Sequence, residues 1–425
     1  MTELPAGWRW STLDEIAGGA HSNVIIGPFG SDLRTVDYRN AGVPLVFVRN
    51  IRAKDFGPGG ARLSEEKAAE LMAHEARRGD VLITKMGDPP GDAAVYTGDR
   101  AIITADCVRI RPANGYLSAY LAHSFGAPSV RTQVESITRG VAQRKVSLGR
   151  MRTVRIPVPP IDEQRRIVEI LEDHLSRLDA ADAYLAVSAR RLAVMSVAGL
   201  WQATHGLDGA VVCRLGEVAD VRLGRQRSPK NHQGDRMVPY MRAANVDWNR
   251  LRLDDVKTMQ FTAAESDTYE LRLGDILLTE ASGSASEVGK SVLYRDEVPG
   301  ACFQNTVLRV RCRQGNPEFV QRYLLGEARA GRFRPESRGV GIHHLGRQRL
   351  ASFSIELPPL DRQDAAVEKA DDVLGACERL RVELDRARRL QQQLRRALLH
   401  AAFTGRLTGH ASDVDRVEEL AVGTG

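Results

Sequence analysis

The sequence predicts an α+β protein with two similar globular α/β domains, each followed by one long helix. Three observations support this fold class: the chain repeats itself once, each copy begins with short apolar runs, and each copy ends in a segment with heptad spacing. The chain has 425 residues, enough for two to four domains, and its hydrophobic fraction of 43% is that of an ordinary globular protein.

The repeat consists of matching segments that keep the same order along the chain. Residues 77–84 (RRGDVLIT) recur as residues 272–279 (RLGDILLT), and residues 156–164 (IPVPPIDEQ) recur as residues 355–363 (IELPPLDRQ). The period is close to the length of a whole domain. We therefore interpret the repeat as a tandem duplication and not as a solenoid.

The first part of each copy mixes strand and helix signals. Val81–Thr84 and Ile276–Thr279 are apolar runs after a Gly-Asp turn, a pattern typical of buried strands. Ser64 precedes Glu65 and Glu66 and is a good helix cap, so we expect a helix that continues from Lys67 to Arg78.

A pair of prolines then marks a boundary in each copy, because proline stops the preceding structure and suits the entry to a helix. Asp162 and Asp361 follow as candidate helix caps. The predicted divisions are a first globular domain at 1–155, a helix at 156–204, a second globular domain at 205–354, a second helix at 355–409 and a flexible tail at 410–425.

Apolar residues recur every seven positions in both long helical segments, as coiled-coil packing requires. The expected packing residues are Leu171, Leu178, Leu185, Leu192, Val373, Leu380, Leu384, Leu394 and Leu398. Asp182, Ser196 and Gln391 interrupt these rows. We expect the two helices to form an antiparallel coiled coil; the alternative is that each helix packs only on its own domain.

The net charge of +6 is modest, but basic residues cluster at 139–155, 222–236 and 329–349. Clustered like charges predict a polyanionic partner such as DNA, although any single cluster could be a solvated surface. Arg, Asn, Gln and His can also contact base edges. The candidate DNA-binding residues are Arg49, Asn50, Arg52, Lys85, Arg139, Gln143, Arg144, Lys145, Arg225, Arg227, Lys230, Asn231, Arg242, Asn245, Lys290, Arg338, His343, His344 and Arg347.

Several motifs imitate catalytic sites without matching them. Residues 88–91 (DPPG) lack the aromatic residue of an amino-methyltransferase loop, and residues 283–291 have the wrong glycine spacing for a P-loop. The pair His343-His344 has no further metal ligand at useful spacing. We therefore predict no catalytic residue, no metal site and no cofactor on this chain.

The location is predicted from what the sequence lacks. The five cysteines are scattered, no signal peptide is visible, and the longest apolar runs are too short to span a bilayer. We expect a cytoplasmic protein without a membrane partner.

Several segments together resemble the specificity subunits of Type I restriction–modification systems. They are the opening Leu4-Pro5-Ala6-Gly7-Trp8, the Gly-Asp turns before the apolar runs, the Pro-Pro-x-Asp-x-Gln helix openings at 159–164 and 358–363, and the ending Thr404-Gly405-Arg406-Leu407. The resemblance extends over essentially the whole chain, in the order that the family shows.

That resemblance implies two target-recognition domains, each reading half of a bipartite double-stranded DNA target in a host-defence system. The helices would set the spacing of the half-sites and carry two methyltransferase subunits, which modify adenine at N6, and restriction subunits where these exist. AdoMet, ATP and Mg²⁺ would be bound by those partners. The alternatives are a self-contained DNA methyltransferase or nuclease, and a coiled-coil adaptor without a DNA role.

Overall fold

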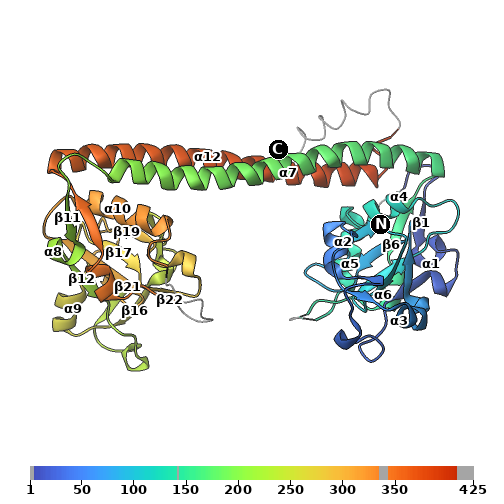
Figure 1. Cartoon of the computed structure of the whole chain (residues 1–425), viewed down its shortest axis with the longest axis horizontal. Helices are drawn as coiled ribbons and strands as arrows, with labels where there is room; N and C mark the ends of the chain where they lie inside the picture. The colour runs from blue at the N-terminus through green and yellow to red at the C-terminus, as the bar shows by residue number, and fades with distance from the viewer. Residues whose placement is uncertain (1–3, 141–142, 335–342, 409–425) are drawn as a thin grey trace. The chain divides into compact units, whose positions relative to one another are not determined.

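The structure is a computed structural model that describes residues 4–140, 143–334 and 343–408 (Figure 1). The chain forms two compact units: unit 1 comprises residues 1–185 and 386–425, and unit 2 comprises residues 186–385. Each unit contains one globular domain and one half of each long helix. The division of the chain into globular domains, helices and tail stays a prediction.

Unit 1 has one four-stranded sheet in the order β2-β9-β6-β7 and another in the order β4-β3-β8-β5. Strands β3 and β8 are parallel, and the other neighbours are antiparallel. The strands are β2 (Val24–Ile26), β3 (Val43–Val46), β4 (Arg62–Leu63), β5 (Glu75–Arg77), β6 (Val81–Thr84), β7 (Ala93–Val95), β8 (Arg100–Ile103) and β9 (Cys107–Ile110). The short helices are α1 (Leu13–Ile16), α2 (Val48–Ala53), α3 (Glu65–Glu70), α4 (Ser118–Ser124), α5 (Pro128–Ile137) and α6 (Leu148–Arg152).

Unit 2 repeats this arrangement with sheets in the orders β12-β21-β17-β19 and β16-β13-β20. The strands of these sheets are β12 (Ala219–Leu223), β13 (Met237–Met241), β16 (Lys257–Gln260), β17 (Ile276–Thr279), β19 (Ser291–Leu293), β20 (Cys302–Phe303) and β21 (Val307–Cys312). Two further hairpins pair β14 (Val246–Asp247) with β15 (Arg250–Leu251), and β18 (Ala281–Ser282) with β22 (His343–His344). The helices are α8 (Leu215–Val218), α9 (Ala263–Tyr269), α10 (Pro317–Arg329) and α11 (Arg347–Ala351). The matching strand orders confirm the duplication.

The predicted central strands are confirmed, because every residue of β6 and β17 is buried. The helix predicted after Ser64 is only partly correct. Ser64 caps α3 through a hydrogen bond from the Lys67 N–H at 3.2 Å, but α3 ends at Glu70. A short 3-10 helix at Met72–His74 follows, and Glu75–Arg77 then form β5, which pairs with β8 and buries Glu75 and Ala76.

A two-stranded sheet precedes each long helix. β1 (Arg9–Thr12) pairs with β10 (Arg155–Val158), and β11 (Val211–Arg214) pairs with β23 (Ser354–Leu357). The long helices α7 (Ile161–Thr204) and α12 (Leu360–Ala402) begin directly after the paired prolines. Asp162 and Asp361 therefore lie inside the first turn and are not the caps that the sequence predicted.

The glutamine of each Pro-Pro-x-Asp-x-Gln motif fixes the start of its helix. Gln164 accepts a hydrogen bond from the Leu117 N–H at 3.0 Å and donates to the Pro159 carbonyl at 3.0 Å. Gln363 accepts from the Asn316 N–H at 2.7 Å and donates to the Pro358 carbonyl at 2.6 Å. Both side chains are buried, so these bonds join the helix to the globular domain in each unit.

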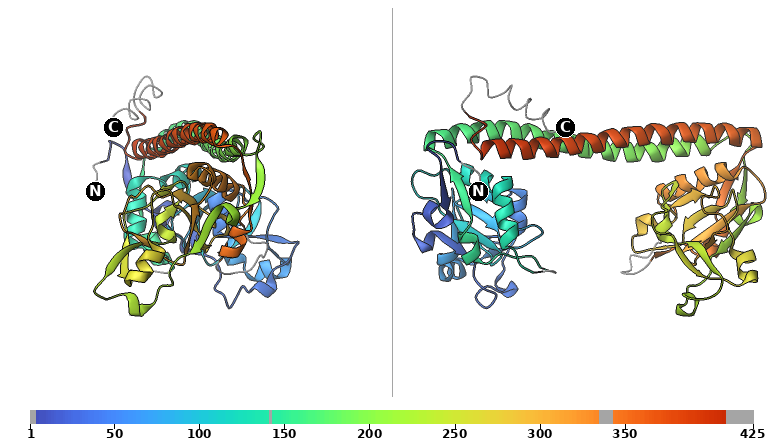
Figure 2. Two further views of the ribbon diagram at one scale, coloured as in Figure 1. Left: turned by 90° about the vertical axis from the view of Figure 1, so that its left-hand side faces the viewer. Right: turned by 180° about the vertical axis from the view of Figure 1, so that it is seen from behind.

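The two long helices pack against each other in an antiparallel manner, as predicted (Figure 2). In unit 1, Gln391 donates from Nε2 to the Leu178 carbonyl at 2.9 Å, and Arg395 forms an ion pair with Asp179. Gln391 was expected to weaken the seam, but its amide is buried and hydrogen bonded across the helix pair. The helices also pack on the domain, because Leu171 and Leu398 belong to the core of unit 1.

In unit 2 the helices meet through small and apolar residues. Leu200 and Ala203 of α7 share one buried cluster with Ala370 of α12, and Leu374 packs against that cluster. The expected packing residues Leu178, Leu185, Leu192, Val373, Leu384 and Leu394 are half-buried. Leu380 is 52% exposed and was wrongly placed in the seam; its neighbours Cys377 and Leu384 are half-buried at this level instead.

The last described residues of the chain complete the core of unit 1. The rings of Phe403 and Tyr120 lie 5.1 Å apart, and Leu407 belongs to the same buried cluster as Trp8. Thr408 donates to one carboxylate oxygen of Glu163 at 2.8 Å, and the Trp8 indole donates to the other at 3.1 Å. The beginning and the end of the described chain are therefore held together inside one unit.

One helix among the described residues, α7, is long and apolar enough to cross a membrane by length and composition alone. No such segment was expected from the sequence, in which the uninterrupted apolar runs are short. Only 11% of the most apolar stretch is buried. The helix contacts α12 through Leu178 in unit 1 and through Leu200 and Ala203 in unit 2.

We predict that Phe403→Ala lowers the free energy of unfolding of unit 1 by about 3–5 kcal/mol, because it leaves a cavity beside Tyr120 in a closed core. Urea unfolding followed by hydrogen exchange of unit 1 amides measures the loss. Leu390→Ala on α12 is the matched control; Leu390 is exposed, and we expect a change within about 0.5 kcal/mol. Equal effects of the two substitutions would contradict the closure of the core by the C-terminal segment.

Candidate nucleic-acid interface

In unit 1, the ends of three strands meet the turn between β8 and β9. The Gly27 N–H donates to the Cys107 carbonyl at 3.3 Å, the Thr104 N–H donates to the Val46 carbonyl at 3.0 Å, and the Lys85 N–H donates to the Asp106 carbonyl at 2.8 Å. We call the segments that leave these strand ends, at 27–34, 47–54 and 85–92, the loop edge of unit 1. Gly27 is required at this approach, because a Cβ atom there would lie 2.3 Å from the Thr104 carbonyl oxygen.

Part of the first basic cluster folds back onto this loop edge. Arg139 and Lys145 exchange backbone hydrogen bonds of 3.0 and 2.9 Å, and the Val146 N–H donates to the Lys85 carbonyl at 3.0 Å. The side chains of Arg139, Gln143 and Lys145 are exposed. The structure therefore brings together Lys85 and these three candidates, which are separated by more than fifty residues in the sequence.

Two other candidate arginines of unit 1 hold the segment 85–92 in place. Arg52 forms an ion pair with Asp92 at 2.9 Å and donates to the Pro89 carbonyl at 3.0 Å. Arg144 forms an ion pair with Asp88 at 2.6 Å. Arg49 differs, because its exposed guanidinium stacks on the Phe47 ring at 4.2 Å from the ring centroid. That stacking fixes the direction of the Arg49 side chain at the loop edge.

Unit 2 has an equivalent loop edge, formed by the segments that leave β12, β13 and β17. The Gly224 N–H donates to the Val307 carbonyl at 3.2 Å, the Gln304 N–H donates to the Met241 carbonyl at 2.9 Å, and the Glu280 N–H donates to the Thr306 carbonyl at 2.9 Å. The hairpin β18–β22 brings His343 and His344 to this edge. The loop edge of unit 2 therefore has the same backbone construction as that of unit 1.

The candidate arginines Arg225 and Arg242 of this edge have partners inside unit 2. Arg225 is 13% exposed, stacks on Phe261 and forms an ion pair with Glu265 at 2.8 Å. Burial alone would raise the pKa of Glu265, but hydrogen bonds from the Thr262 N–H and from Arg225 outweigh it and lower the pKa. Arg242 forms an ion pair with Asp255 at 2.7 Å.

The remaining candidates of unit 2 include exposed and half-buried residues. Arg227 and Lys230 are exposed in the loop after β12, and Arg227 donates to the His232 ring at 3.0 Å. Asn231 in the same loop is half-buried. Arg347 is exposed at the start of α11. Arg338 lies outside the described residues.

Two candidates that the sequence assigned to base contacts have a structural role instead. Asn50 accepts from the Phe47 N–H at 3.0 Å and donates to the Asp55 carbonyl at 3.1 Å. Asn245 accepts from the Arg242 N–H at 3.2 Å and donates to two backbone carbonyls of its own loop at 2.8 and 3.2 Å. Asn245 is only 2% exposed. Both amides are committed to the backbone, because they close the loops that carry the other candidates.

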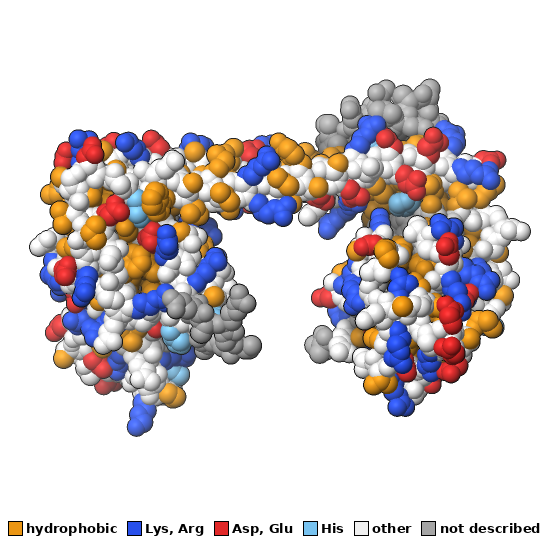
Figure 3. All heavy atoms as spheres, in the orientation of Figure 1, with side chains coloured by type: hydrophobic (Ala, Val, Ile, Leu, Met, Phe, Trp, Pro, Cys, Tyr) orange, Lys and Arg blue, Asp and Glu red, His pale blue; other side chains and the backbone are white. Residues whose placement is uncertain are grey.

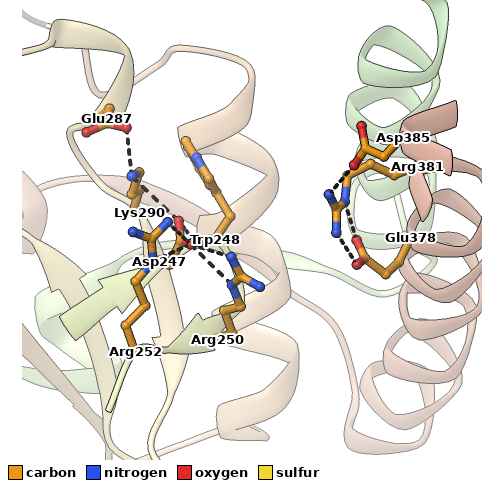
Figure 4. Close-up of polar contacts among 9 residues, drawn as sticks. All are labelled: Asp247, Trp248, Arg250, Arg252, Glu287, Lys290, Glu378, Arg381 and Asp385. Carbon is orange, nitrogen blue, oxygen red and sulfur yellow. Dashed lines mark hydrogen bonds and ion pairs between the residues drawn. The ribbon is translucent and has the colours of Figure 1, made fainter. Parts of the chain in front are cut away.

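Lys290 also lies in a cluster of its own and is not free at the surface (Figure 4). Its ammonium group lies 2.8 Å from Glu287 and 3.5 Å from Asp247, and the guanidinium groups of Arg250 and Arg252 also bind Asp247. Burial alone would raise the pKa of Asp247, but a hydrogen bond from the Trp248 N–H and the bonds from both arginines outweigh it and lower the pKa. The carboxylate therefore stays ionised and holds three cations around the β14–β15 hairpin.

Among the described residues no group of three or more His, Cys, Asp or Glu side chains could hold a metal ion. One residue of the loop edge of unit 2 was absent from the sequence-based candidates: Glu280, whose side chain contacts His344. In the sequence it looked like an isolated acidic residue beyond a strand. Alignment of the two copies would have identified it, since Glu280 occupies the place of the candidate Lys85.

Comparison with known proteins identifies relatives of the whole arrangement. The family described as Type I restriction modification DNA specificity domain matches residues 78–182 and 208–381. The chain is 23% identical over 320 residues to the Type I restriction enzyme StySPI specificity subunit of Salmonella potsdam, covering 72% of this chain and 68% of the relative. It is 22% identical over 318 residues to the EcoKI specificity subunit of Escherichia coli K12, covering 72% and 68%.

Two solved structures share the fold. A chain from a study of complex assembly and conformational transition in a type I R-M system superposes with a TM-score of 0.71 at 20% identity, covering 96% of this chain and all of that chain. The HsdS subunit of Thermoanaerobacter tengcongensis superposes with a TM-score of 0.51 at 20% identity, covering 96% and 99%. The fold class predicted from the sequence is thereby confirmed.

We predict that Asn245→Ala destabilises unit 2 by about 1–3 kcal/mol, because it removes the hydrogen bonds between the buried Asn245 amide, the Arg242 N–H and the Arg252 and Asp255 carbonyls. Lys145→Ala in unit 1 is expected to change the stability of its own unit by no more than about 0.5 kcal/mol, since its side chain is exposed. Thermal unfolding of the purified chain measures both. If Asn245→Ala leaves the thermal stability unchanged, Asn245 is again a candidate for a base contact.

Proposed function

The chain belongs to the Type I restriction modification DNA specificity family, and from this premise we propose that its two loop edges read the two halves of a bipartite DNA target. The observation that carries the proposal is the pair of equivalent loop edges. Both are built from the same backbone hydrogen bonds, yet they present different side chains. A duplicated scaffold with different reading surfaces suits a target whose two halves differ in sequence.

The charge of the exposed residues supports a DNA partner. Arg49, Arg139 and Lys145 in unit 1, and Arg227 and Lys230 in unit 2, are exposed on segments at or next to a loop edge. Cations of this kind bind phosphates and position a protein on the duplex, while side chains between them contact base edges. Residues with internal partners, such as Arg52 and Arg225, support the proposal indirectly, because they fix the shape of the loops.

The specificity subunits to which the chain is similar carry recognition and not catalysis. We propose that the same holds here, and that the chemistry resides in two methyltransferase subunits and, where present, restriction subunits. AdoMet, ATP and Mg²⁺ would then be bound by these partners. The DNA and all partners meet in the cytoplasm. A self-contained methyltransferase or nuclease and a DNA-independent adaptor are the competing functions, and binding and methyl-transfer experiments separate them.

The long helices offer a surface for the methyltransferase subunits. Hydrophobic side chains gather along α7 and α12 on the face seen in Figure 3. In unit 2, Val194 is 68% exposed and Met195 is 62% exposed, and Trp201 is exposed on the same helix. Exposed apolar side chains in such number are typical of a protein interface.

We predict that the chain, purified with its methyltransferase subunits, binds duplex DNA with an affinity that falls steeply as salt concentration rises. The double variant R49A/R139A is expected to reduce the slope of log affinity against log salt by about 2, one unit for each phosphate that is no longer neutralised. Fluorescence anisotropy at several salt concentrations measures this slope.

The control for that measurement is R362A. This variant removes an exposed arginine of α12 that belongs to neither loop edge. Its slope should equal that of the wild-type complex. Binding that is independent of salt, or absent, would remove the DNA-binding function and favour the adaptor. Transfer of labelled methyl groups to DNA by the chain alone would establish the enzyme instead.

We predict that V194E/M195E prevents assembly of the methyltransferase subunit on unit 2, because two carboxylates cannot be buried in an apolar interface without a large desolvation cost. Light scattering after size exclusion measures the mass of the complex. Leu273→Glu is the control, since Leu273 is an exposed apolar residue in the turn before β17. A complex of unchanged mass with V194E/M195E would exclude this surface.

A further inference from the structure

The residue after the central strand has the same backbone environment in both units. The Lys85 N–H donates to the Asp106 carbonyl at 2.8 Å, and the Lys85 carbonyl accepts from the Val146 N–H at 3.0 Å. Glu280 makes the corresponding bonds to Thr306 at 2.9 Å and from Leu345 at 2.8 Å. Lys85 and Glu280 therefore occupy equivalent positions at the two loop edges with opposite charges.

The residue that pairs with the next position of the chain is also equivalent in the two units. In unit 1, Met86 forms a β-bridge with Lys145, and in unit 2, Ala281 pairs with His344 in the hairpin β18–β22. Unit 1 thus carries two lysines at this place, Lys85 and Lys145. Unit 2 carries a carboxylate and an imidazole there.

Glu280 and His344 contact each other directly. The His344 Nδ1 lies 3.0 Å from one carboxylate oxygen of Glu280 and 3.2 Å from the other. When the ring is neutral, this contact places its proton on Nδ1, because a carboxylate oxygen accepts the hydrogen bond. The Nε2 atom is then left as an acceptor, and the ring direction is fixed by Glu280. Glu280 is 8% exposed, whereas the His344 side chain is 59% exposed.

The fold itself does not need this pair. In unit 1 the same backbone hydrogen bonds form around Lys85 and Lys145, so two lysines take the place of the carboxylate and the imidazole. An exposed imidazole whose orientation is fixed by a buried carboxylate is therefore a feature of the reading surface of unit 2. The role of the His344 imidazole follows from the hydrogen bonds that it can accept or donate.

The two loop edges offer opposite hydrogen-bonding groups to DNA. In the major groove, adenine and cytosine present an exocyclic amino group as donor, whereas guanine presents two acceptors. Lysine has only donors, while the ionised carboxylate and the Nε2 atom of neutral histidine are acceptors.

Building on the proposed function, we propose that His344, positioned by Glu280, determines specificity in the half-site read by unit 2. It accepts a hydrogen bond from the amino group of adenine or cytosine at one base pair. The equivalent position of unit 1, with Lys85 and Lys145, donates to guanine.

The experiment is a selection of duplexes from a random library by the complex of the full chain with its methyltransferase subunits. The wild-type complex is expected to select a bipartite sequence with adenine or cytosine at the position that His344 contacts. E280K/H344K, which copies the lysines of unit 1, is expected to change the preference at that one position toward guanine by about tenfold or more. All other positions should keep their preference.

Two further variants make the result decisive. Glu280→Leu keeps a side chain of similar size but removes the acceptor that holds the Nδ1 proton, and we expect it to weaken the preference at the same position even if E280K/H344K fails to fold. Lys85→Leu is the matched control in unit 1 and should change the preference only in the half-site that unit 1 reads. The inference is overturned if Glu280→Leu leaves the preference unchanged, or if Glu280→Leu changes the half-site that Lys85→Leu changes.

The same experiment separates this inference from the function on which it rests. A wild-type complex that selects no sequence contradicts the proposed function itself. A wild-type complex that selects a bipartite sequence, with Glu280→Leu selecting the same one, contradicts only the role of the Glu280–His344 pair.

Discussion

The loop edges depend on backbone hydrogen bonds between strand ends and the turn that follows the neighbouring strand. In unit 1 these bonds connect Lys85 with Asp106 and Val146, and in unit 2 they connect Glu280 with Thr306 and Leu345. Because the main chain provides them, they do not depend on which side chain stands at the position. A lysine in one unit and a glutamate in the other leave the direction of the backbone unchanged.

A second set of contacts uses side chains, and it explains why only some polar residues at these edges are accessible to a partner. Asn50 and Asn245 close their loops through bonds to the main chain, and Arg52 and Arg225 are held by acidic neighbours. These residues shape the loops. The exposed residues between them, such as Lys145 and His344, are then presented from a fixed frame. Recognition needs both groups, since a mobile loop would lose entropy on binding.

Local patterns in the sequence were sufficient for much of the fold. The duplication, the buried strands β6 and β17, and the two long helices all leave periodic or repeated signals. The helix after Ser64 was extended too far because its charged residues suit a helix as well as the strand β5, and the pairing with β8 decides between them. Leu380 was misplaced because a heptad row does not show which neighbouring row makes the contact.

The candidate site was predictable only in outline. Basic clusters indicated where a polyanion could bind, but arginine and asparagine are equally suited to a base edge and to a loop carbonyl. Asn245 and Arg52 were therefore indistinguishable from Lys145 before their partners were known. Arg52 binds a carbonyl in a distant segment, and Asn245 binds carbonyls of its own loop; in neither case does the local spacing of residues show that the contact forms. Glu280 is not among the residues predicted from the sequence, because an acidic side chain is not expected to bind the phosphates of DNA.

The closure of unit 1 by Phe403 and Leu407 has a consequence for how the protein is made. Unit 2 is one continuous stretch of chain, so it can complete its core as soon as its own residues have left the ribosome. Unit 1 is begun first but lacks part of its core until the last helix has been synthesised. The N-terminal half is thus the later of the two to mature. A ribosome that stops early releases a chain with an open apolar core at its beginning.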